Sequence, residues 1–441
     1  MIFKRKLYDK MLEWKQRNGS TALLIKGARR VGKSTLVEEF AKHEYKSYIL
    51  IDFSTKNKKI MQLFDDLSSL DYFFMNLQQE TGITLYNRES AIVFDEVQNF
   101  PPARQAIKHL VKDGRYDYIE TGSLISIRKN VQNIIIPSEE EKLVLHPLDF
   151  EEFLWATGNE AGFKFLRMFY EKRLPLGPAH RKTMRDLRLY MLVGGMPQSV
   201  NEYLSKNNLQ EVDRIKRDII DLYDGDFMKI DPTGRASMIF KNIPSQLTGN
   251  ASRYLVETAI NRKRTDDIAV LINEMKESMA VDLAFHATDP RVGLGMNRSM
   301  DAFKMYLLDT GLFVTLAFWD KAFTENVIYN KLLSDKLEAN LGYVYENLVA
   351  QMLRVSDNEL YYYTFPTETE KHNYEVDFLL SRGNKLVPLE VKSSGYKTHK
   401  SLDEFCKKFS SRIGERILLY TKDYYKDGET VCMPVYFTPF L

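Results

Sequence analysis

Eight residues near the N-terminus have the spacing of a phosphate-binding loop. They fit the pattern G-x-x-x-x-G-K-[ST]. The eight residues are Gly27, Ala28, Arg29, Arg30, Val31, Gly32, Lys33 and Ser34, and Thr35 follows them as a further candidate for nucleotide binding. Gly27 and Gly32 permit backbone angles that other residues resist, so the N–H groups of the loop turn inward around phosphate oxygens. We expect Lys33 to reach the β- and γ-phosphates of ATP during catalysis, and Ser34 to bind Mg²⁺. A glycine-rich turn without a ligand is the alternative.

Two carboxylates follow a short apolar run further along the chain. The segment Ala91–Glu96 reads AIVFDE, so four apolar residues lead into Asp95 and Glu96. Ligands of open parallel sheets lie at the carboxyl ends of the strands. We expect Asp95 to hold Mg²⁺ through water and Glu96 to polarise the attacking water. A strand that simply runs into a polar loop is the alternative.

A third polar strand end follows at residues 116–121. It carries Glu120, Thr121 and, after Gly122, Ser123. Thr121 or Ser123 is the candidate for a polar group that faces the γ-phosphate. Thr-Gly-Ser is also ordinary turn chemistry, so a plain turn remains the alternative.

The C-terminal part carries a second set of charged residues. Glu390 and Lys392 lie two apart on a predicted strand and therefore on one face of it, and Asp377 lies on the preceding strand. Glu346 lies near the start of a predicted helix, 342–353. The order helix glutamate, strand aspartate, Glu-x-Lys resembles the PD-(D/E)XK nuclease fold over residues 337–441. The resemblance implies that the three carboxylates bind a metal and that Lys392 assists a water; a solvated polar face is the alternative.

Alternating strands and helices position the N-terminal candidates. Short apolar runs predict strands at 21–26, 46–53, 91–94 and 116–121, with helical stretches between them. This alternation indicates an α/β fold with a parallel sheet covered by helices on both faces, up to about residue 150. Residues 149–223 are predicted to be mostly helical. Further strands are expected at 280–288, 303–309, 360–365, 374–380, 386–392, 416–421 and 432–437, with a helix near 399–411.

Residues 1–320 resemble the bacterial and archaeal AAA+-like ATPases of the archaeal ATPase group, which carry an uncharacterised C-terminal domain. The segments that carry this resemblance are GARRVGKST, IVFDEVQNF, TGSL, LHPLDFEEFL, VGGMP and KMYLLDTGLF. The resemblance implies a helical lid and a winged-helix-like segment after the P-loop core. The expected domains are an ATPase core at 1–150, a lid at 151–225, a winged-helix-like region at 226–325 and a nuclease-like domain at 326–441.

The sequence does not identify which arginine, if any, contacts the γ-phosphate in trans, as an arginine finger does. Many relatives have Gly-Arg before the PL-x-F-x-E-F-L segment, whereas the corresponding stretch here reads PSEEEKLVL, so no arginine role is carried over to it. A solvated surface position is the alternative for each arginine. The candidates are Arg30, Arg104, Arg115 and Arg128.

The predicted helix 266–277 raises the question of DNA contact in the middle region. Arg262, Lys263 and Arg264 precede it, and a recognition helix of a winged-helix module enters the major groove. Its first turn carries Asp266 and Asp267, which DNA phosphates repel. Packing within the protein is therefore the favoured interpretation, and DNA readout is the alternative.

The composition limits the class of protein. The 441 residues include 62 Lys+Arg and 60 Asp+Glu, a net charge of +2, so net charge alone does not recruit nucleic acid or a membrane. Cys406 and Cys432 cannot form a disulfide framework and fit a reducing compartment. No apolar run approaches the ~20 residues of a membrane-spanning helix, and the start lacks a secretory signal. We expect a cytoplasmic protein without a membrane partner.

Three functions fit these patterns. The first is an ATPase that uses Mg²⁺ and is coupled to a C-terminal domain that binds or cleaves DNA. The second is a nucleotide-dependent switch whose nuclease-like domain only docks a protein partner or another copy of the chain. The third is a small-molecule kinase, against which the Asp95-Glu96 pair and the large remainder of the chain argue. Salt dependence separates the first two, because nucleic-acid binding weakens steeply as salt rises.

Overall fold

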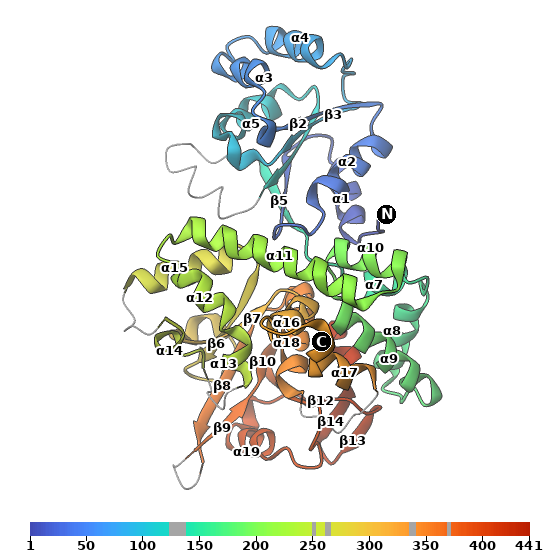
Figure 1. Cartoon of the computed structure of the whole chain (residues 1–441), viewed down its shortest axis with the longest axis vertical. Coiled ribbons are helices and arrows are strands. Elements are labelled where there is room, and N and C mark those ends of the chain that lie inside the picture. Colours follow the sequence, from blue (N-terminus) through green and yellow to red (C-terminus); the bar gives the residue numbers. More distant parts are fainter. Residues whose placement is uncertain (123–137, 249–252, 261–265, 335–340, 368–371) are drawn as a thin grey trace. The chain divides into compact units, whose positions relative to one another are not determined.

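A computed structural model describes residues 1–122, 138–248, 253–260, 266–334, 341–367 and 372–441. The chain divides into two compact units (Figure 1). Unit 1 comprises Met1–Pro147 with the short stretch Glu277–Met279, and unit 2 comprises Leu148–Lys276 and Ala280–Leu441. Each unit is described by itself below.

Unit 1 is built around a parallel sheet with the strand order β2-β3-β4-β1-β5. Every neighbouring pair in this order is parallel, which confirms the predicted α/β class. Strand β4 lies between β1, which precedes the glycine-rich loop, and β3, which ends in Asp95. The elements are α1 (Leu7–Lys15), β1 (Ala22–Lys26), α2 (Lys33–Glu44), β2 (Ser47–Asp52), α3 (Lys58–Gln62), α4 (Leu70–Thr81), β3 (Ser90–Asp95), α5 (Pro101–Asp113), β4 (Asp117–Gly122) and β5 (Glu140–Val144).

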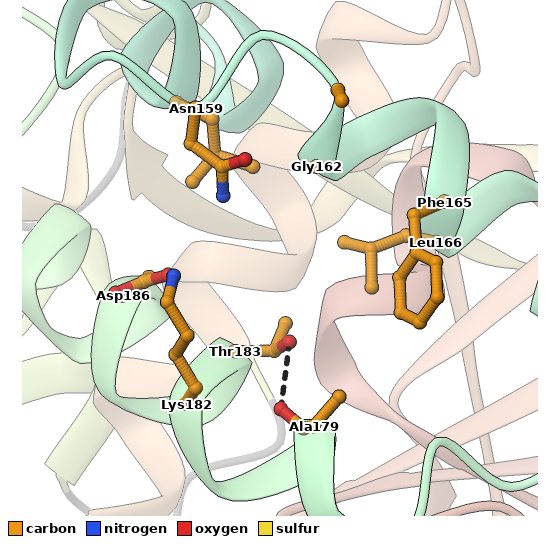
Figure 2. Close-up of a pocket in the computed structure, with 10 residues that line it drawn as sticks. Asn159, Gly162, Phe165, Leu166, Ala179, Lys182, Thr183 and Asp186 are labelled. Atoms are coloured by element: carbon orange, nitrogen blue, oxygen red, sulfur yellow. Dashed lines mark hydrogen bonds and ion pairs between the residues drawn. The ribbon is translucent and has the colours of Figure 1, made fainter.

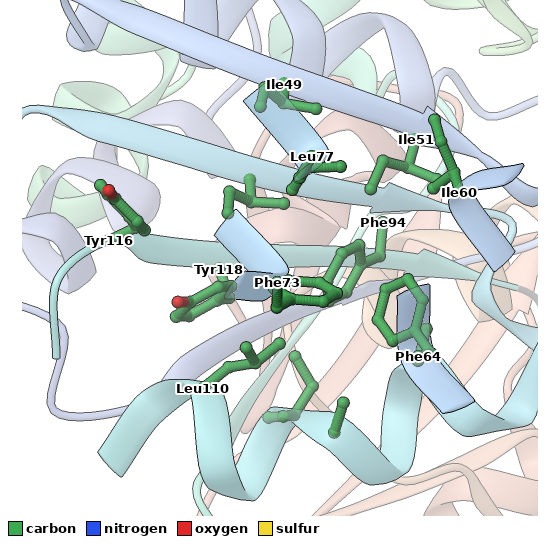
Figure 3. Packing of buried hydrophobic residues seen from close by; sticks show 14 of the residues in the cluster. Ile49, Ile51, Ile60, Phe64, Phe73, Leu77, Phe94, Leu110, Tyr116 and Tyr118 are labelled. Atoms are coloured by element: carbon green, nitrogen blue, oxygen red, sulfur yellow. The ribbon is translucent and has the colours of Figure 1, made fainter. Parts of the chain in front are cut away.

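Apolar packing on one face of this sheet orders the helices that follow β2 and β3. Ile92 and Phe94 alternate with Ala91 and Val93 along β3, so the two pairs point to opposite faces of the sheet. The Ile92 and Phe94 face packs against buried side chains of α4 and α5, as Figure 3 shows for Phe73 and other members of this core. Each fully buried phenylalanine contributes about 2–3 kcal/mol relative to an exposed one.

Strand β5 was not predicted from the sequence. It reads EEKLV, and three of its five residues are charged. It pairs with β1 in parallel register from Ala22↔Glu140 to Lys26↔Val144. Because β5 closes one end of the sheet, its side chains are largely only partly buried, and the sequence lacks the apolar run of an interior strand.

Unit 2 begins with a run of helices, in agreement with the helical pattern predicted for residues 149–223. Asp149 caps the first of them in a capping box with Glu152, which satisfies two otherwise unpaired backbone donors. These helices and those that follow are α7 (Phe150–Ala156), α8 (Gly162–Lys172), α9 (Pro178–Val193), α10 (Pro197–Lys206), α11 (Leu209–Ile230), α12 (Arg235–Lys241), α13 (Ile243–Thr248), α14 (Val256–Ile260), α15 (Asp266–Glu277), α16 (Thr310–Leu316), α17 (Val327–Leu333), α18 (Gly342–Val355) and α19 (Lys400–Lys408).

Two sheets form the other part of unit 2. One has the order β7-β6-β8-β9 and the other the order β10-β11-β12-β14-β13. Their strands are β6 (Val281–Ala287), β7 (Arg298–Leu307), β8 (Tyr361–Pro366), β9 (Asn373–Val376), β10 (Phe378–Arg382), β11 (Lys385–Lys392), β12 (Arg416–Tyr420), β13 (Tyr425–Asp427) and β14 (Thr430–Pro434).

The first of these sheets joins the predicted middle and C-terminal regions. Strand β6 pairs in parallel with β8, through Phe285↔Tyr361 and His286↔Tyr362. One sheet therefore runs across the position, 325/326, at which the sequence suggested a boundary. Lys263 and its neighbours at 261–265 lie outside the described residues, while α15 has the predicted bounds.

The predicted hairpin in the C-terminal part is confirmed. Strands β10 and β11 pair antiparallel, and the turn between them has Gly383 at φ +57°. The strand expected at 374–380 is interrupted, because Asp377 lies at a bend between β9 and β10, which belong to different sheets. The strand expected at 432–437 ends early, and a short 3-10 helix spans Val435–Phe440.

The segments VGGMP and LLDTG meet inside unit 2. The carboxylate of Asp309 accepts a hydrogen bond of 2.6 Å from the backbone N–H of Gly195. A Cβ atom on Gly195 would lie 2.0 Å from the carbonyl oxygen of Leu148, and one on Gly311 would lie 2.6 Å from the Cα of Gly194. The segments thus approach backbone to backbone, which only glycine permits here.

A fully buried lysine joins the same junction. Lys216 of α11 donates to the carbonyl oxygens of Leu192, at 2.7 Å, and Gly311, at 3.1 Å. Burial lowers the pKa of Lys216 to about 8, and the carboxylates of Asp213 and Asp309 oppose this shift. The positive end of the side chain is thereby compensated by carbonyl and carboxylate oxygens, as a buried charge requires.

Helix α18 is tied to the same region by its amide side chains. The Oε1 atom of Gln351 accepts from the backbone N–H of Thr310 at 2.8 Å, and its Nε2 donates to the Tyr190 hydroxyl at 2.8 Å. Asn347 accepts from the N–H of Leu307 at 2.9 Å. These buried bonds link the helical, middle and C-terminal parts of unit 2.

None of the helices within the described ranges is long and apolar enough to cross a membrane.

Candidate functional site

The glycine-rich loop connects β1 to α2 in unit 1. Gly32 takes the left-handed conformation, with φ +95°, directly before the first residue of α2. A Cβ atom on Gly27 would lie 2.3 Å from the carbonyl oxygen of Leu145, so the chain after β5 leaves no room for a side chain there. Ala28 and Val31 are buried, whereas Arg29, Arg30 and Thr35 are exposed. The loop therefore turns tightly and leads directly into the N-terminus of α2, the end of a helix that favours anions.

Lys33 begins α2 and folds back over the loop. Its Nζ atom donates to the carbonyl oxygens of Gly27, at 3.0 Å, and Ala28, at 2.9 Å. Burial lowers the pKa of Lys33, and the carboxylates of Glu96 and Asp95 act in the opposite direction. The ammonium group therefore lies where the loop, its glycines and both acidic residues come together.

Asp95 links the loop to the neighbouring strands. Its Oδ1 atom accepts from the Ser34 hydroxyl at 2.9 Å and also from the Thr121 hydroxyl. Ser34 belongs to α2 and Asp95 ends β3, whereas Thr121 lies near the end of β4, which is next to β3 in the sheet. The structure thus brings three of the predicted site residues into direct contact. Ser123, the other candidate at this strand end, lies outside the described residues.

Glu96 is held in an unusual backbone conformation beside Asp95. Its φ angle is +54°, a region that costs a non-glycine residue about 1–2 kcal/mol. The backbone N–H of Glu96 donates to the Thr121 hydroxyl at 3.2 Å, and its carboxylate accepts from the Gln98 side-chain amide. Strain of this kind is often associated with functional sites. Gln98 was missed in the sequence because a glutamine in a polar loop carries no signal of its own.

The oxygen atoms of Ser34 and Asp95 have the chemistry that would suit a magnesium ion bound together with a nucleotide. Ser34 and Asp95 present a hydroxyl and a carboxylate oxygen 2.9 Å apart, and both are hard oxygen ligands. Magnesium commonly keeps several waters and takes one or two protein ligands, with substrate phosphates as the others. When bound, the ion neutralises negative charge that develops on the phosphates.

Arg5 is a further residue at the loop that the sequence did not indicate. It is buried, and it donates to the carbonyl oxygen of Val31 at 3.1 Å and to that of His146 at 2.6 Å. Its guanidinium therefore joins the phosphate loop to the chain that follows β5. No motif surrounds Arg5, and the contact depends on a fold that brings distant backbone segments together.

The candidate arginines lie in different surroundings. Arg104 is buried, and its Nη2 atom donates to both carboxylate oxygens of Glu140, at 2.8 and 2.9 Å. Arg115 binds Asp113 and Asp71 at 2.8 and 2.6 Å. Arg30 is exposed in the glycine-rich loop, with φ +68°. Arg128 lies outside the described residues. Within the described ranges, Arg30 is therefore the candidate whose side chain faces solvent beside the loop.

The C-terminal candidate Glu346 contacts a lysine from the middle of the chain. Lys304 of β7 donates to Oε1 of Glu346 at 2.7 Å and to Oε1 of Glu375 at 2.5 Å. Burial alone lowers the pKa of Lys304, but Glu346, Tyr306 and Glu375 raise it well above its usual value. Neither Lys304 nor Glu375 was singled out in the sequence, because each lies in a stretch that reads as an ordinary strand.

Asp377 interacts electrostatically with Lys304 and with Glu390. Oδ2 of Asp377 accepts from the N–H of Val391 at 2.7 Å. Burial and the carboxylate of Glu346 raise the pKa of Asp377 well above its usual value. The Lys392 ammonium lies 3.1 Å from Oε1 of Glu390, as expected for residues on one face of a strand.

These residues do not fit an open metal centre. Throughout the described ranges, no group of three or more His, Cys, Asp or Glu side chains is arranged to hold a metal ion. Glu346, Asp377 and Glu390 each accept hydrogen bonds from protein donors instead. A divalent ion would have to compete with the ammonium group of Lys304 for the same oxygen atoms.

A cavity of about 300 Å³ lies among α7, α8 and α9 of unit 2 (Figure 2). Three of its polar side chains are engaged within α9: Lys182 binds Asp186 at 2.8 Å, and Thr183 donates to the Ala179 carbonyl at 3.1 Å. None of the residues that line it is a site residue predicted from the sequence. The cavity therefore does not belong to either candidate site.

Comparison with protein families assigns the three main parts of the chain. Residues 19–154 match the AAA domain family. This segment, which includes the parallel sheet of unit 1, is therefore similar to an AAA domain. Residues 184–322 match a domain of unknown function, DUF8612, and residues 341–437 match another, DUF4143. The AAA domain match covers the glycine-rich loop, Asp95, Glu96 and Thr121, whereas the family of the C-terminal segment carries no assigned activity.

Solved structures of other proteins resemble the chain only weakly. PCH-2 of C. elegans is 11% identical with a TM-score of 0.28, and the match covers 47% of this chain and 65% of that chain. The Thermotoga maritima RuvB Holliday junction branch migration motor is 12% identical with a TM-score of 0.29, covering 59% and 83%. Cdc6p from Pyrobaculum aerophilum is 11% identical with a TM-score of 0.23, covering 74% and 92%. A search of curated proteins finds no match.

Proposed function

We propose that this protein binds ATP with Mg²⁺ at the AAA domain and hydrolyses it. The observation that carries the proposal is the contact of Ser34, Asp95 and Thr121, which come from the glycine-rich loop and from two adjacent strand ends. A P-loop whose Ser or Thr holds Mg²⁺ together with an acidic residue at a strand end is the arrangement that P-loop NTPases use for phosphoryl transfer.

Each residue has a distinct part in the proposed reaction. The N–H groups of the loop bind the phosphates, and Lys33 stabilises the charge that the transferred phosphoryl group develops. Ser34 and Asp95 hold the magnesium ion. Glu96 orients the attacking water and accepts its proton, and the contacts to Thr121 and Gln98 fix the position of that glutamate.

We propose further that ATP turnover acts as a switch on the rest of the chain. The glycine-rich loop contacts the chain just before unit 2 begins, because Gly27 abuts the Leu145 carbonyl and Arg5 joins Val31 to His146. A change in the loop on nucleotide binding therefore acts on residues that lead into Leu148, the first residue of unit 2. The C-terminal part is proposed as a docking module.

Cleavage of DNA is not part of this proposal. A metal-dependent nuclease would need the carboxylates of Glu346, Asp377 and Glu390 as metal ligands, but each of them accepts a hydrogen bond from a donor of the protein. Binding of duplex DNA at 50 and 200 mM salt separates the two functions: a DNA-binding protein loses affinity steeply between them. No binding at either salt concentration is expected for a switch that has only protein partners.

Phosphate release from ATP tests the proposed reaction. We expect inorganic phosphate to appear with ATP and Mg²⁺ and to stop when EDTA removes the magnesium. The same assay with added small-molecule acceptors distinguishes hydrolysis from kinase activity. Absence of both ATP binding and phosphate release would contradict the proposal, and transfer to an acceptor other than water would replace it by the kinase function.

A further inference from the structure

A single buried lysine lies at the centre of the C-terminal carboxylates. Lys304 is 5% exposed, and its ammonium group lies 2.7 Å from Glu346 and 2.5 Å from Glu375. The ring of Tyr362 lies beneath it, with the ammonium 5.5 Å from the ring centre. Strand β7 supplies the lysine, whereas α18 and β9 supply the carboxylates, so the contact joins three elements.

The neighbouring oxygens are also occupied by protein donors. The hydroxyl of Tyr306, two residues from Lys304 on the same strand face, donates to Oε1 of Glu346 at 2.6 Å. Glu390 accepts from the N–H of Leu402 at 3.3 Å through one oxygen and pairs with Lys392 through the other. This carboxylate cluster therefore has internal partners at the positions where a metal site needs open ligands.

We propose that the ammonium group of Lys304 takes the place of a divalent metal ion in this cluster. A lysine ammonium is a compact cation with three donors, and here it lies between two carboxylates at hydrogen-bond distance. Calcium and magnesium bind carboxylate oxygens at about 2.0–2.6 Å, so ion and ammonium occupy nearly the same volume and exclude one another. The cluster is a metal-independent clamp.

The clamp connects two segments that match separate families. Lys304 lies within residues 184–322, and both carboxylate partners lie within residues 341–437. Removal of one partner of a buried ion pair is strongly destabilising, because the other charge stays buried without compensation. The two segments therefore move as one body in the proposed switch. This inference deepens the docking role proposed for unit 2, and its test does not involve ATP turnover.

Binding of Mn²⁺ to the full-length protein without nucleotide tests the proposal directly. Electron paramagnetic resonance measures free Mn²⁺, and we expect the parent and Glu346→Gln to bind the same amount. The glycine-rich loop is identical in both proteins, so any weak binding of Mn²⁺ at the loop contributes equally to both measurements. A site in the parent that disappears in Glu346→Gln would overturn the proposal.

Removal of the lysine supplies the second test. In Lys304→Ala the two carboxylates face each other without a cation, and we expect Mn²⁺ to bind at least about tenfold more tightly than in the parent, which corresponds to about 1.4 kcal/mol. Lys304→Ala/Glu346→Gln should lose this gain. Lys331→Ala, an exposed lysine of α17, is the matched control and should behave as the parent. A folded Lys304→Ala without increased Mn²⁺ affinity would contradict the proposal. If the variant does not fold, the comparison of the parent with Glu346→Gln decides.

Discussion

The hydroxyl of Ser34 lies 2.9 Å from Oδ1 of Asp95, although 61 residues separate the two in the chain. The same oxygen accepts from Thr121, near the end of β4, the strand that lies between β3 and β1 in the sheet. A parallel sheet places the carboxyl ends of its strands along one edge, so polar residues from three segments meet there. This contact connects the phosphate loop to the residues proposed to act on water.

Lys33→Ala is expected to remove most of the affinity for ATP. The substitution deletes the buried ammonium group that lies over the loop and is proposed to bind the β- and γ-phosphates. Equilibrium binding of a fluorescent ATP analogue measures the effect. Lys42→Ala, at an exposed position of the same helix, is the control and should bind as the parent does. Equal affinity in Lys33→Ala and the parent would show that the nucleotide binds elsewhere.

Thr121→Val should slow hydrolysis while leaving ATP binding nearly unchanged. Valine fills the same space but loses the hydroxyl that donates to Asp95 and accepts from the N–H of Glu96. A hydrogen bond to a charged group contributes about 1.5–3 kcal/mol, which corresponds to a decrease in kcat of roughly 10- to 100-fold. Steady-state kinetics gives kcat and KM separately. Thr81→Val, on α4, is the control, and a parent-like kcat in Thr121→Val would exclude a role for its hydroxyl.

Gly195→Ala should destabilise unit 2. Its Cβ atom would lie 2.0 Å from the Leu148 carbonyl, so the backbone has to move, at a cost of about 3 kcal/mol. Gly225→Ala is the opposite case: it lies inside α11, where no atom lies within 4 Å of a new Cβ. It should stabilise the protein by about 0.5–1 kcal/mol through helix propensity. Urea unfolding of both variants measures the difference, and similar stabilities would contradict the close contact at Gly195.

Lys216→Met should change how stability depends on pH. Burial lowers the pKa of Lys216 to about 8, whereas the unfolded chain keeps about 10.4. Between these values the unfolded state binds more protons, so this lysine raises the free energy of unfolding as pH increases. The buried charge therefore lowers the free energy of unfolding by its full amount below pH 8. By pH 10.4 the free energy of unfolding has risen by about 3 kcal/mol, because the folded protein has lost this proton.

The test is the difference in unfolding free energy between the parent and Lys216→Met at pH 7, 8, 9 and 10. Subtraction removes other groups that titrate in this range, such as the tyrosines. Above pH 8 we expect the free energy of unfolding of the parent to rise relative to that of Lys216→Met. A difference that does not vary with pH would mean that Lys216 keeps an ordinary pKa inside the fold, despite its burial.

The sequence was sufficient to predict four of the five strands of the parallel sheet in unit 1. Interior strands such as β3 are buried on both faces and therefore appear as uninterrupted apolar runs. The glycine-rich loop carries its own signal because backbone angles and close contacts restrict its residues. Strand β5 has no such signal, since its burial is only partial and its residues are mostly charged.

Sequence patterns could not predict which residues bind the C-terminal carboxylates. Lys304 lies 42 residues from Glu346 and 71 residues from Glu375, and it sits in the segment AFKMYLL, which reads as a plain apolar strand. Only the sheet that joins β6 to β8 brings these segments together. The Glu390–Lys392 contact was predictable because it follows from the two-residue period of one strand.

The proposed role of Glu96 is the most direct test of the account. Glu96→Gln keeps the size of the side chain and its place beside Gln98 but cannot accept a proton from water. We predict that the variant binds ATP as tightly as the parent and releases phosphate about 100-fold more slowly in a single turnover with Mg²⁺. A variant that hydrolyses ATP at the parent rate would contradict the account and assign the proton acceptor to another group.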